Sequence, residues 1–597
     1  MTRRQCLRFL RPYLCEAPST RTAAYARFFS ATRRDLVFAG RPHCSQLSRS
    51  IHNSAARRSD NGSPGAEKDV ESHAATINRR IQKLREFDAL RYPRLANRPK
   101  RMTVPEFRRK YQDVASTPAN EEVVLEGRVM AVRRSGSKLV FLSIMNEYEY
   151  IQIMISLGQL SYPQPTPFEF KQVTSPFLRG DIVSITGKAV RTGKDELTLT
   201  ATELPTLLSP AVAPLPVKLI NEETMVLKRH VDSLVNRDTL DMFRLRSHVL
   251  MFLREFFYKR YFIEVQTPIL ADRADGATAR PFLTSAPQFP HKELALRIAP
   301  ELWLKRLVVG GNDKVFEIGP TFRNEGLDTT HNPEFTMCEF YCAYANLAEL
   351  MAMTRSMFAQ LFQSSNLLIQ RRLQSLYSLR DTLVNTGPWK EVEFIPTLEE
   401  TLGFKFPDLS APDALPELTK LLEDHAVNFS SRPPEATLNK LLDELASTHL
   451  EAHFRHKPFF VVHHPACMSP LAKSFTCPKT GQLVSARAEL FIEGREVANM
   501  YEEENDPFEQ RRKFRLQAEA KSPTSTLGGD EAQGQDPEID ESYVQALEYG
   551  LPPTGGCGFG VDRLVMLISG APRISDTLAF GNLRNVLALR QAARDAS

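Results

Sequence analysis

Hydrophobic and polar residues alternate over residues 122–207, in five short segments separated by glycine or polar residues. The segments are VVLEGRVMAVRR, KLVFLSIM, YEYIQIMIS, GDIVSITGKAV and ELTLTATEL. Alternation with a period of two is typical of strands that bury one face. Five such strands in so short a stretch predict a small closed β-barrel.

An OB-fold is one such barrel and frequently binds oligonucleotides, but other small barrels share the pattern, so the strands alone leave the role of this region open. Before the barrel, residues 76–92 carry apolar side chains at helical spacing, which predicts an amphipathic packing helix. These side chains are Ile77, Ile81, Leu84, Phe87 and Leu90. After the barrel, prolines indicate a connector, and helix and strand patterns then mix. We expect a targeting segment at 1–58, a linker and helix at 59–115, the barrel at 116–210, the connector at 211–231, and a large α+β domain at 232–597.

The first of these parts differs from the rest in charge. Residues 1–58 contain twelve arginines, no lysine and two acidic residues, a net charge of +10, whereas the whole chain is only +5. Such a composition is typical of mitochondrial targeting segments, and we expect import into the matrix; a disordered basic arm that binds nucleic acid is the alternative. No apolar run is long enough for a transmembrane helix, so we expect no membrane integration. Eight cysteines without a CxxC pair argue against a disulfide framework or a zinc ribbon.

A strand, a polar loop and a second strand are predicted over residues 315–323, 324–334 and 335–343. A period of two places one set of side chains of the second strand on a common face: Phe335, Met337, Glu339 and Tyr341. The opposite face is a plausible core: Thr336, Cys338, Phe340 and Cys342. A carboxylate and a phenol are unusual on a strand face whose only role is to pack against a hydrophobic core.

The loop could recognise a nucleoside triphosphate. Arg323 could hold a phosphate in a bidentate manner, and Glu325 could accept a hydrogen bond from an adenine amino group. Phe335 could stack against the purine. An exposed charged hairpin is the alternative. No GxxxxGK[ST] loop is present, and residues 555–560 (GGCGFG) lack the context of a dinucleotide fingerprint, so nucleotide chemistry would need another scaffold.

Several segments together resemble a known family. FRNEG…HNPEF resembles motif 2 of the class II aminoacyl-tRNA synthetases, and GLPPTGGCGFGVDRLVML (550–567) resembles motif 3. FFYKRYFIEVQTPIL (256–270) is similar to motif 1, whose proline would be Pro268. With RIAPELWLKRLVVGG (297–311) and NMYEEENDP (499–507), the match is to the lysyl-tRNA synthetase family, over about residues 79–595.

This resemblance implies an α+β class II catalytic domain, an antiparallel sheet flanked by helices, after a five-stranded OB-fold that binds the anticodon. The implied reaction joins lysine to tRNA(Lys) with ATP and Mg²⁺. A homodimer is also implied, with Pro268 in its interface. The related aspartate or asparagine enzyme is one alternative. A non-catalytic tRNA-binding paralogue is another, against which the retained motif residues argue.

The resemblance also implies roles for single residues. Arg323 and Arg563 would be the cationic clamps of the reaction. The nucleotide contacts would be Arg323, Glu325, His331, Asn332, Phe335 and Arg563. The lysine contacts would be Gly276, Glu301, Glu339, Tyr341, Asn499 and Glu503. An acidic pocket suits an ammonium group, whereas an aspartate enzyme would need cationic groups there.

Two carboxylates implied to hold Mg²⁺ lie in a predicted hairpin. If Glu493-Gly494 forms a two-residue turn, Phe491 pairs with Glu496, and Glu489 lies diagonally from Glu496 on the same face. Two carboxylates that face phosphates suit Mg²⁺. An exposed acidic hairpin is the alternative. Simple alternation places Asn499 on the opposite face, unless a bulge interrupts the strand.

In the barrel, four residues match anticodon-contacting positions of the family: Arg134, Phe141, Gln152 and Glu196. Phe141 could stack on an unpaired base or pack in the barrel core. The chain also departs from the family pattern, because Glu502 and Glu504 replace a small hydroxyl residue and a leucine, which extends Glu503 into an acidic run.

Overall fold

The computed structural model describes residues 73–94, 101–273, 279–377, 379, 383, 388–430, 437–454, 457–521 and 539–588. The predicted targeting segment, 1–58, and Gly276 lie outside the described residues. The chain divides into two compact units, Met1–Ala75 and Thr76–Ser597, and the elements below belong to the second, apart from the start of α3. Among the described residues, no helix is both long and apolar enough to cross a membrane.

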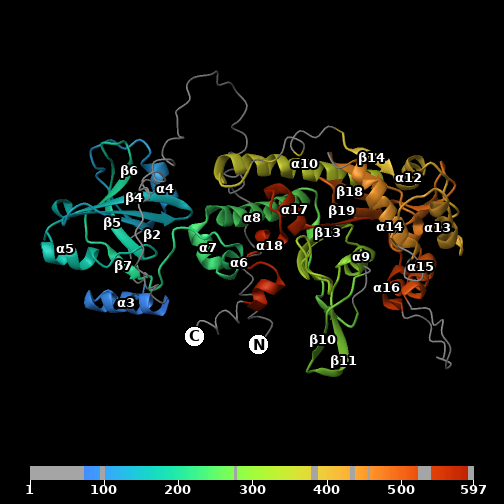
Figure 1. The fold of residues 1–597 in the computed structure, drawn as a ribbon, viewed down its shortest axis with the longest axis horizontal. Helices are drawn as coiled ribbons and strands as arrows, with labels where there is room; N and C mark the ends of the chain where they lie inside the picture. Colours follow the sequence, from blue (N-terminus) through green and yellow to red (C-terminus); the bar gives the residue numbers. More distant parts are fainter. Residues whose placement is uncertain are drawn as a thin grey trace, which may run out of the picture. The chain divides into compact units, whose positions relative to one another are not determined.

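The five predicted strands form a closed barrel (Figure 1). They are β2 (Glu122–Arg134), β3 (Leu139–Asn146), β4 (Glu149–Ser156), β5 (Ile182–Arg191) and β6 (Leu197–Ala201). The barrel closes because β2 pairs with β5 and β4 pairs in parallel with β6. The short strands β1 (Arg101–Met102) and β7 (Thr206–Ser209) extend the sheet. The interior is filled by Val, Ile and Leu side chains from alternate positions, as the pattern predicted.

The helices around the barrel were only partly predicted. The helix expected over 76–92 is α3 (His73–Glu86), which ends early because Asp88 adopts φ 49° and turns the chain. The buried Arg80 of α3 forms an ion pair with Asp181 at 3.0 Å. Two further helices flank the strands, α4 (Val104–Lys110) and α5 (Pro167–Thr174). The second begins with a capping box formed by Thr166 and Glu169. The expected connector, 211–231, contains α6 (Glu222–Leu227) and the start of α7 (Arg229–Val235).

The larger domain is built on an eight-stranded sheet with the order β14-β15-β18-β19-β20-β13-β12-β8. The strands are β8 (Ile263–Glu264), β12 (Lys314–Phe322), β13 (Glu334–Ala343), β14 (Lys390–Glu393), β15 (Phe459–Val462), β18 (Arg487–Ile492), β19 (Arg495–Glu502) and β20 (Thr554–Gly560). The central strands are antiparallel. The predicted strand pair around the polar loop is β12 and β13, so this prediction is confirmed.

Helices cover both faces of this sheet (Figure 1). One face carries α8 (Arg237–Tyr258), α10 (Leu347–Arg372) and α17 (Val561–Ser569), which share an apolar core with Cys338, Phe340 and Phe559. The other face carries α9 (Glu301–Val309), α15 (Pro507–Lys521) and α16 (Glu541–Leu547), which pack beside Tyr341. Glu339 therefore points to the side of α9 and α15.

Further elements surround this framework. A separate apolar cluster holds α12 (Phe394–Leu402), α13 (Ala414–Asp424) and α14 (Leu438–His449) against the edge of the sheet. A hairpin, β10 (Leu283–Ala286) and β11 (Phe289–Leu296), extends from the domain next to β9 (Leu270–Ala271). The remaining short elements are β16 (Ser474–Thr476), β17 (Leu483–Ser485) and α18 (Ile574–Thr577).

Candidate active site

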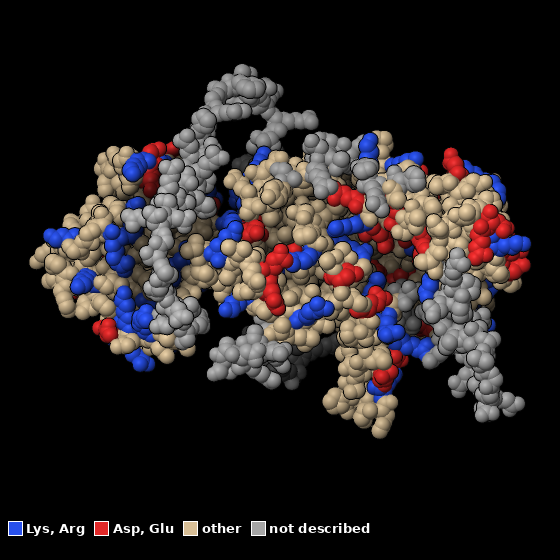
Figure 2. Space-filling view, viewed as in Figure 1, with Lys and Arg blue, Asp and Glu red and all other residues tan. Residues whose placement is uncertain are grey.

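A cleft of about 690 Å³ opens over β13, β18, β19 and β20. It brings together twelve of the residues singled out in the sequence: Glu301, Arg323, Glu325, His331, Asn332, Phe335, Glu339, Tyr341, Glu489, Glu496, Asn499 and Arg563. The face of β13 with Phe335, Met337, Glu339 and Tyr341 lines the cleft. On the predicted core face, Cys338, Phe340 and Cys342 are buried in the apolar cluster, whereas Thr336 is half-buried outside it. Acidic side chains are visible around the hollow of this domain in Figure 2.

Cationic side chains gather at one end of the cleft. The guanidinium of Arg323 lies 5.2 Å from the ring centre of Phe335. Within the described residues, the buried Nε of Arg323 has no hydrogen-bond partner, and it is therefore available to bind an anionic ligand. Arg563 is in the first turn of α17, and the neighbouring Asp562 fixes that turn by accepting a hydrogen bond from the backbone N–H of Thr336 at 2.7 Å.

His331 links this cationic end to the polar loop. Arg563 Nη2 lies 2.7 Å from His331 Nε2, and Asp328 Oδ2 lies 2.7 Å from His331 Nδ1. Because a guanidinium only donates, Nε2 must accept and Nδ1 must carry the proton. Hydrogen bonds from the backbone of Thr330 and from His331 hold the pKa of Asp328 below its usual range. Asn332 accepts a hydrogen bond from the backbone N–H of Leu583 at 3.1 Å and so fixes the base of the loop.

The register predicted for the acidic hairpin is confirmed next to its turn. Phe491 pairs with Glu496, and both turn residues have positive φ, 52° at Glu493 and 71° at Gly494, as a type I′ turn requires. The ladder shifts by one residue between Leu490 and Phe491, so that Glu489 lies opposite Asn499. This bulge is the device that brings Asn499 to the cleft face.

The two hairpin carboxylates have different surroundings. Burial would raise the pKa of Glu489, but Arg487 and His464 outweigh it and hold the pKa at about 2. His464 Nε2 lies 3.2 Å from Glu489 Oε2, and Arg487 Nε donates to Asn499 Oδ1 at 3.1 Å. Enclosure by the cleft and the charge of Glu489 raise the pKa of Glu496 to about 7.

A divalent cation fits this pair. Two adjacent carboxylates that repel each other are the hard oxygen donors that Mg²⁺ prefers, and Mg²⁺ usually keeps waters and phosphate oxygens as its other ligands. Among the described residues, no group of three or more His, Cys, Asp or Glu side chains is arranged to hold a metal by itself. The site therefore suits a metal that arrives with a phosphate ligand.

Carboxylates gather at the other end of the cleft. Glu339 is buried, and Tyr341 donates to its Oε2 at 3.1 Å. Burial and the charge of Glu301 raise the pKa of Glu339 to about 8. Tyr501 donates to both oxygens of Glu301 at 2.9 Å. Glu503 is also buried, and its Oε1 lies against Gly556, which lines the cleft.

Sequence reasoning missed Lys305, Tyr501 and Arg487. Lys305 is fully buried on α9; its Nζ lies 2.6 Å from Glu301 Oε1 and also contacts Glu503. The spacing of four between Glu301 and Lys305 on a helix could have indicated this pair. Arg487 is two residues before Glu489 on one strand, so period two could have placed both on the same face.

The glycine-rich strand β20 forms the floor beneath these carboxylates. Gly556 pairs with Tyr341 on one side and with Tyr501 on the other, and Gly558 pairs with Glu339 and Asn499. A Cβ atom at Gly556 would overlap Glu503 Oε1 and lie 2.5 Å from Tyr341 Cε1. The glycines of GGCGFG therefore leave room for side chains of the neighbouring strands.

The comparisons with known proteins agree with this geometry. Residues 221–584 match the family of tRNA synthetases class II (D, K and N), and residues 123–207 match the OB-fold nucleic acid binding domain. The chain belongs to the class II tRNA synthetases. The barrel of this synthetase is thus an OB-fold, and the sheet that carries the cleft lies in its class II domain.

Individual relatives of the synthetase are lysine–tRNA ligases. The mitochondrial enzyme of Schizosaccharomyces pombe is 39% identical over 520 residues, which cover 86% of this chain and 94% of the relative. The mitochondrial enzyme of Saccharomyces cerevisiae is 34% identical over 517 residues, 82% of this chain and 87% of the relative. The enzyme of Listeria innocua is 37% identical over 486 residues, 80% of this chain and 91% of the relative.

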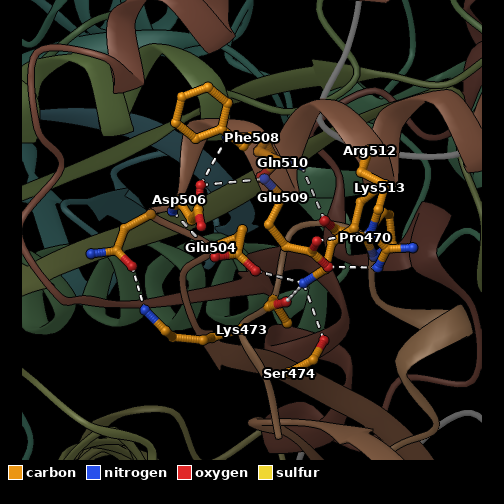
Figure 3. Close-up of polar contacts among 12 residues, drawn as sticks. Pro470, Lys473, Ser474, Glu504, Asp506, Phe508, Glu509, Gln510, Arg512 and Lys513 are labelled. Atoms are coloured by element: carbon orange, nitrogen blue, oxygen red, sulfur yellow. Dashed lines mark hydrogen bonds and ion pairs between the residues drawn. The ribbon is translucent and has the colours of Figure 1, made fainter.

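The acidic run of the synthetase is three residues with three different partners. Glu502 accepts a hydrogen bond from the backbone N–H of Leu347 at 2.9 Å, at the start of α10. Glu503 contacts Lys305. Glu504 forms a buried ion pair with Lys513 at 2.6 Å, and Lys513 also donates to the carbonyl of Ala472 at 2.7 Å (Figure 3).

Lys513→Met should lower the free energy of unfolding by about 3–5 kcal/mol, because Glu504 would stay buried without its cation. The double variant Glu504→Leu/Lys513→Met restores an apolar pair and should recover most of this loss. Arg512→Ala, which breaks the more exposed pair with Glu509, should cost at most about 1 kcal/mol. Urea and thermal unfolding of the full chain measure all three. A double variant as unstable as the single one would contradict the expected role of the pair.

The barrel residues of the synthetase separate into two places. Phe141 is half-buried on the outer face, outside the barrel core, and the guanidinium of Arg133 lies 4.7 Å from its ring centre. Gln152 donates to Thr198 Oγ1 at 3.1 Å on the neighbouring strands, and Glu196 is exposed. Arg134 instead donates to three carbonyls at the end of α5, those of Thr174, Ser175 and Phe177. The structure thus places Arg133, rather than Arg134, beside Phe141.

Proposed function

We propose that this synthetase is the lysine–tRNA ligase of mitochondria and charges tRNA(Lys). The observation that carries the choice of amino acid is the acidic end of the cleft. Glu339 and Glu301 form this acidic end, whereas Arg323 and Arg563 lie at the opposite end of the cleft. Lysine has two ammonium groups and one carboxylate. The ammonium groups match the acidic end of the cleft, and the carboxylate, next to ATP, matches the end that carries the two arginines.

The proposed reaction has two steps. The lysine carboxylate attacks the α-phosphorus of ATP and expels pyrophosphate, which leaves lysyl-adenylate. The terminal ribose hydroxyl of the tRNA then attacks the carbonyl carbon of lysyl-adenylate and releases AMP. Arg323 and Arg563 stabilise the charge that develops on the phosphorus, and Phe335 stacks on the adenine. Glu325 receives the adenine amino group, and His331 and Asn332 hold the loop near the outer phosphates. Catalysis is then positioning and charge stabilisation, as in other phosphoryl-group chemistry.

Mg²⁺ would be held by Glu489 and Glu496 and would neutralise phosphate charge beside them. The bulge places Asn499 opposite Glu489, so that both side chains would face the substrate. Gly276 is proposed to contact the α-ammonium group. Glu503 is proposed to act in the lysine pocket.

ATP–pyrophosphate exchange tests the assignment of the amino acid. Exchange that depends on lysine, and is absent with aspartate or asparagine, supports the proposal. Exchange with aspartate or asparagine instead of lysine would overturn it, and absence of exchange with any of the three would favour a non-catalytic paralogue.

The outer face of the barrel is proposed to bind the anticodon of tRNA(Lys). Phe141 would stack on a base, with Gln152 and Glu196 reading its edge. Exposed basic side chains of this domain would contact phosphates, and Lys and Arg are spread over the barrel in Figure 2. They include Arg101, Arg108, Arg109, Lys110, Arg133 and Lys138. Arg134 would act indirectly, by holding α5 in place.

Import into the mitochondrial matrix is proposed from the composition of residues 1–58, which combine a net charge of +10 with only two acidic residues. The named mitochondrial relatives support it. A reporter fused to residues 1–58 should enter mitochondria, and a reporter that stays in the cytosol would overturn this assignment.

We expect a homodimer built on the motif 1 region. Pro268 is exposed, and apolar side chains near it are exposed as well: Ile263 by 53%, Ile269 by 39% and Leu270 by 51%. Such a surface is typical of a contact between subunits. Analytical ultracentrifugation of the protein should show a dimer, and Ile269→Asp should shift it towards the monomer. An active wild-type monomer would contradict the expectation.

A further inference from the structure

His464 is a buried histidine, two residues after β15, that contacts the acidic hairpin. Its side chain is only 2% exposed, and its Nε2 lies 3.2 Å from Glu489 Oε2. The imidazole ring packs against the ring of Phe394, with 5.1 Å between the two ring centres. The other ring nitrogen, Nδ1, is buried and has no hydrogen-bond partner among the described residues. In that part of the chain, the contact with Glu489 is therefore the single hydrogen bond of the imidazole ring.

His464 donates this hydrogen bond. A carboxylate that also pairs with a guanidinium, as Glu489 does with Arg487, is ionised and can only accept, so the proton lies on Nε2. Nδ1 then carries a lone pair that is buried without a donor, which costs free energy. A phenylalanine would pack against Phe394 and avoid this cost. Packing alone therefore does not account for a histidine at this position, whereas the hydrogen bond to Glu489 does.

Glu489 is held at its other oxygen as well. Arg487 Nη2 pairs with Glu489 Oε1, and this arginine is itself fixed, because it donates to Asn499 Oδ1 at 3.1 Å and to Ser469 Oγ at 3.0 Å. Each oxygen of the Glu489 carboxylate thus has one buried donor. A carboxylate oxygen has two lone pairs, so each oxygen can still accept one further ligand.

The second carboxylate of the hairpin is free by comparison. Glu496 is exposed to the cleft, and within the described ranges its carboxylate makes no hydrogen bond or ion pair. One carboxylate of the pair is therefore fixed before a ligand arrives, and the other can change its rotamer to meet that ligand.

We propose that His464 is a positioning residue for the divalent cation, whose Nε2–H fixes the side chain of Glu489 in the orientation that binds the metal. The inference rests on the proposed function, in which Glu489 and Glu496 hold Mg²⁺, and deepens it. His464 acts through the carboxylate, because Mg²⁺ prefers oxygen ligands to imidazole. Removal of a group that fixes a metal ligand typically weakens metal binding by about 10–100-fold.

The test compares His464→Phe, which keeps a ring against Phe394 but lacks the donor, with His464→Gln, whose side-chain amide can donate from near the position of Nε2. Calorimetry measures the affinity of each full-length protein for the non-hydrolysable ATP analogue AMPPCP, with Mn²⁺ and without metal. The ratio of the two dissociation constants gives the contribution of the metal. His464→Phe should reduce this ratio by about 10-fold or more, with the metal-free affinity within about threefold of wild type. His464→Gln should keep the ratio within about threefold.

His463→Asn is the matched control. This neighbouring histidine is half-buried, and its Nδ1 lies 3.7 Å from Glu393 instead of facing Glu489. Asparagine tolerates the positive φ of 59° at this position. The ratio of dissociation constants should stay at the wild-type value.

A folded His464→Phe variant with the wild-type ratio would overturn the inference. A His464→Gln variant as impaired as His464→Phe would also overturn it, because the donor would then not be the cause. A merely structural role would weaken AMPPCP binding equally with and without metal. If His464→Phe does not fold, His464→Leu, which also lacks the donor, takes its place. Wild-type protein that binds AMPPCP equally well with and without Mn²⁺ would instead overturn the metal site of the proposed function.

Discussion

Glu339→Gln should lower kcat/KM for lysine by roughly 10²–10³-fold in ATP–pyrophosphate exchange. The substitution keeps the shape of the side chain and its hydrogen bond with Tyr341, but removes the negative charge that we propose faces the ammonium group of lysine. Because the side chain is buried, water cannot replace that charge. The KM for ATP should change little, since Arg323 and Arg563 remain at the other end of the cleft.

The same residue should set a pH dependence. The pKa of Glu339 is about 8 in the protein without substrate, so the carboxyl group is largely protonated at neutral pH. An ammonium group binds the ionised form. In the wild type, kcat/KM for lysine should therefore rise with pH up to about 8, and the Gln variant should lose this rise.

Glu502→Gln is the control for both measurements. Glu502 accepts its hydrogen bond from Leu347 at the start of α10, and a glutamine oxygen can accept the same bond. We expect kcat/KM for lysine to stay within about threefold of wild type. If Glu339→Gln retained the wild-type kcat/KM for lysine, the assignment of the ammonium pocket would be wrong.

Gly556→Ala is expected to reduce lysine activation by at least about 10²-fold. Its Cβ would overlap Glu503 Oε1 and lie 2.5 Å from Tyr341 Cε1, so both side chains would have to move. Neither has free space, because both are buried among the neighbouring strands. Pyrophosphate exchange measures the loss, and a thermal melt shows whether the fold is retained.

Gly560→Ala is the matched substitution on the same strand. Its Cβ would be 4.0 Å from the Cβ of Arg563, an ordinary contact distance. We expect a much smaller change in exchange activity. Equal losses in the two variants would show that space beneath the pocket is not the reason for glycine at position 556.

The barrel strands and the pair β12 and β13 could be predicted because alternation is a local property of the chain, whereas β8, β14 and β15 of the larger sheet were not predicted. The five barrel segments and the two faces of β13 followed from period two, and the turn at Glu493-Gly494 followed from residue types. The early end of α3 could not be predicted, because the apolar spacing continues to Leu90 although the chain turns at Asp88. The bulge in β19 was required by Asn499, but its position depends on pairing with β18.

The site was predictable chiefly where a motif coincided with a strand face. Glu339 combines both kinds of information, whereas Arg323, just after β12, and Arg563, on α17, were identified from their motifs. Lys305 lies in a motif segment, but its second partner, Glu503, is far away in the sequence. Arg134 was predicted from the family pattern, but its partners are backbone carbonyls at the end of α5, which no sequence pattern shows. Conversely, a buried ion pair such as Glu504–Lys513 cannot be recognised from composition, because the same letters on a surface would be solvated.

The bulge in β19 also has a consequence for comparing sequences. Two residues on one side of a regular strand are separated by an even number of positions, whereas Glu496 and Asn499 both line the cleft with a separation of three. An odd spacing between side chains of one site is therefore itself a signature of an inserted residue. In a distant relative without the bulge, the two strands of the acidic hairpin would pair in a regular ladder. The residue equivalent to Asn499 would then be expected two positions after the residue equivalent to Glu496, one position earlier than in this chain.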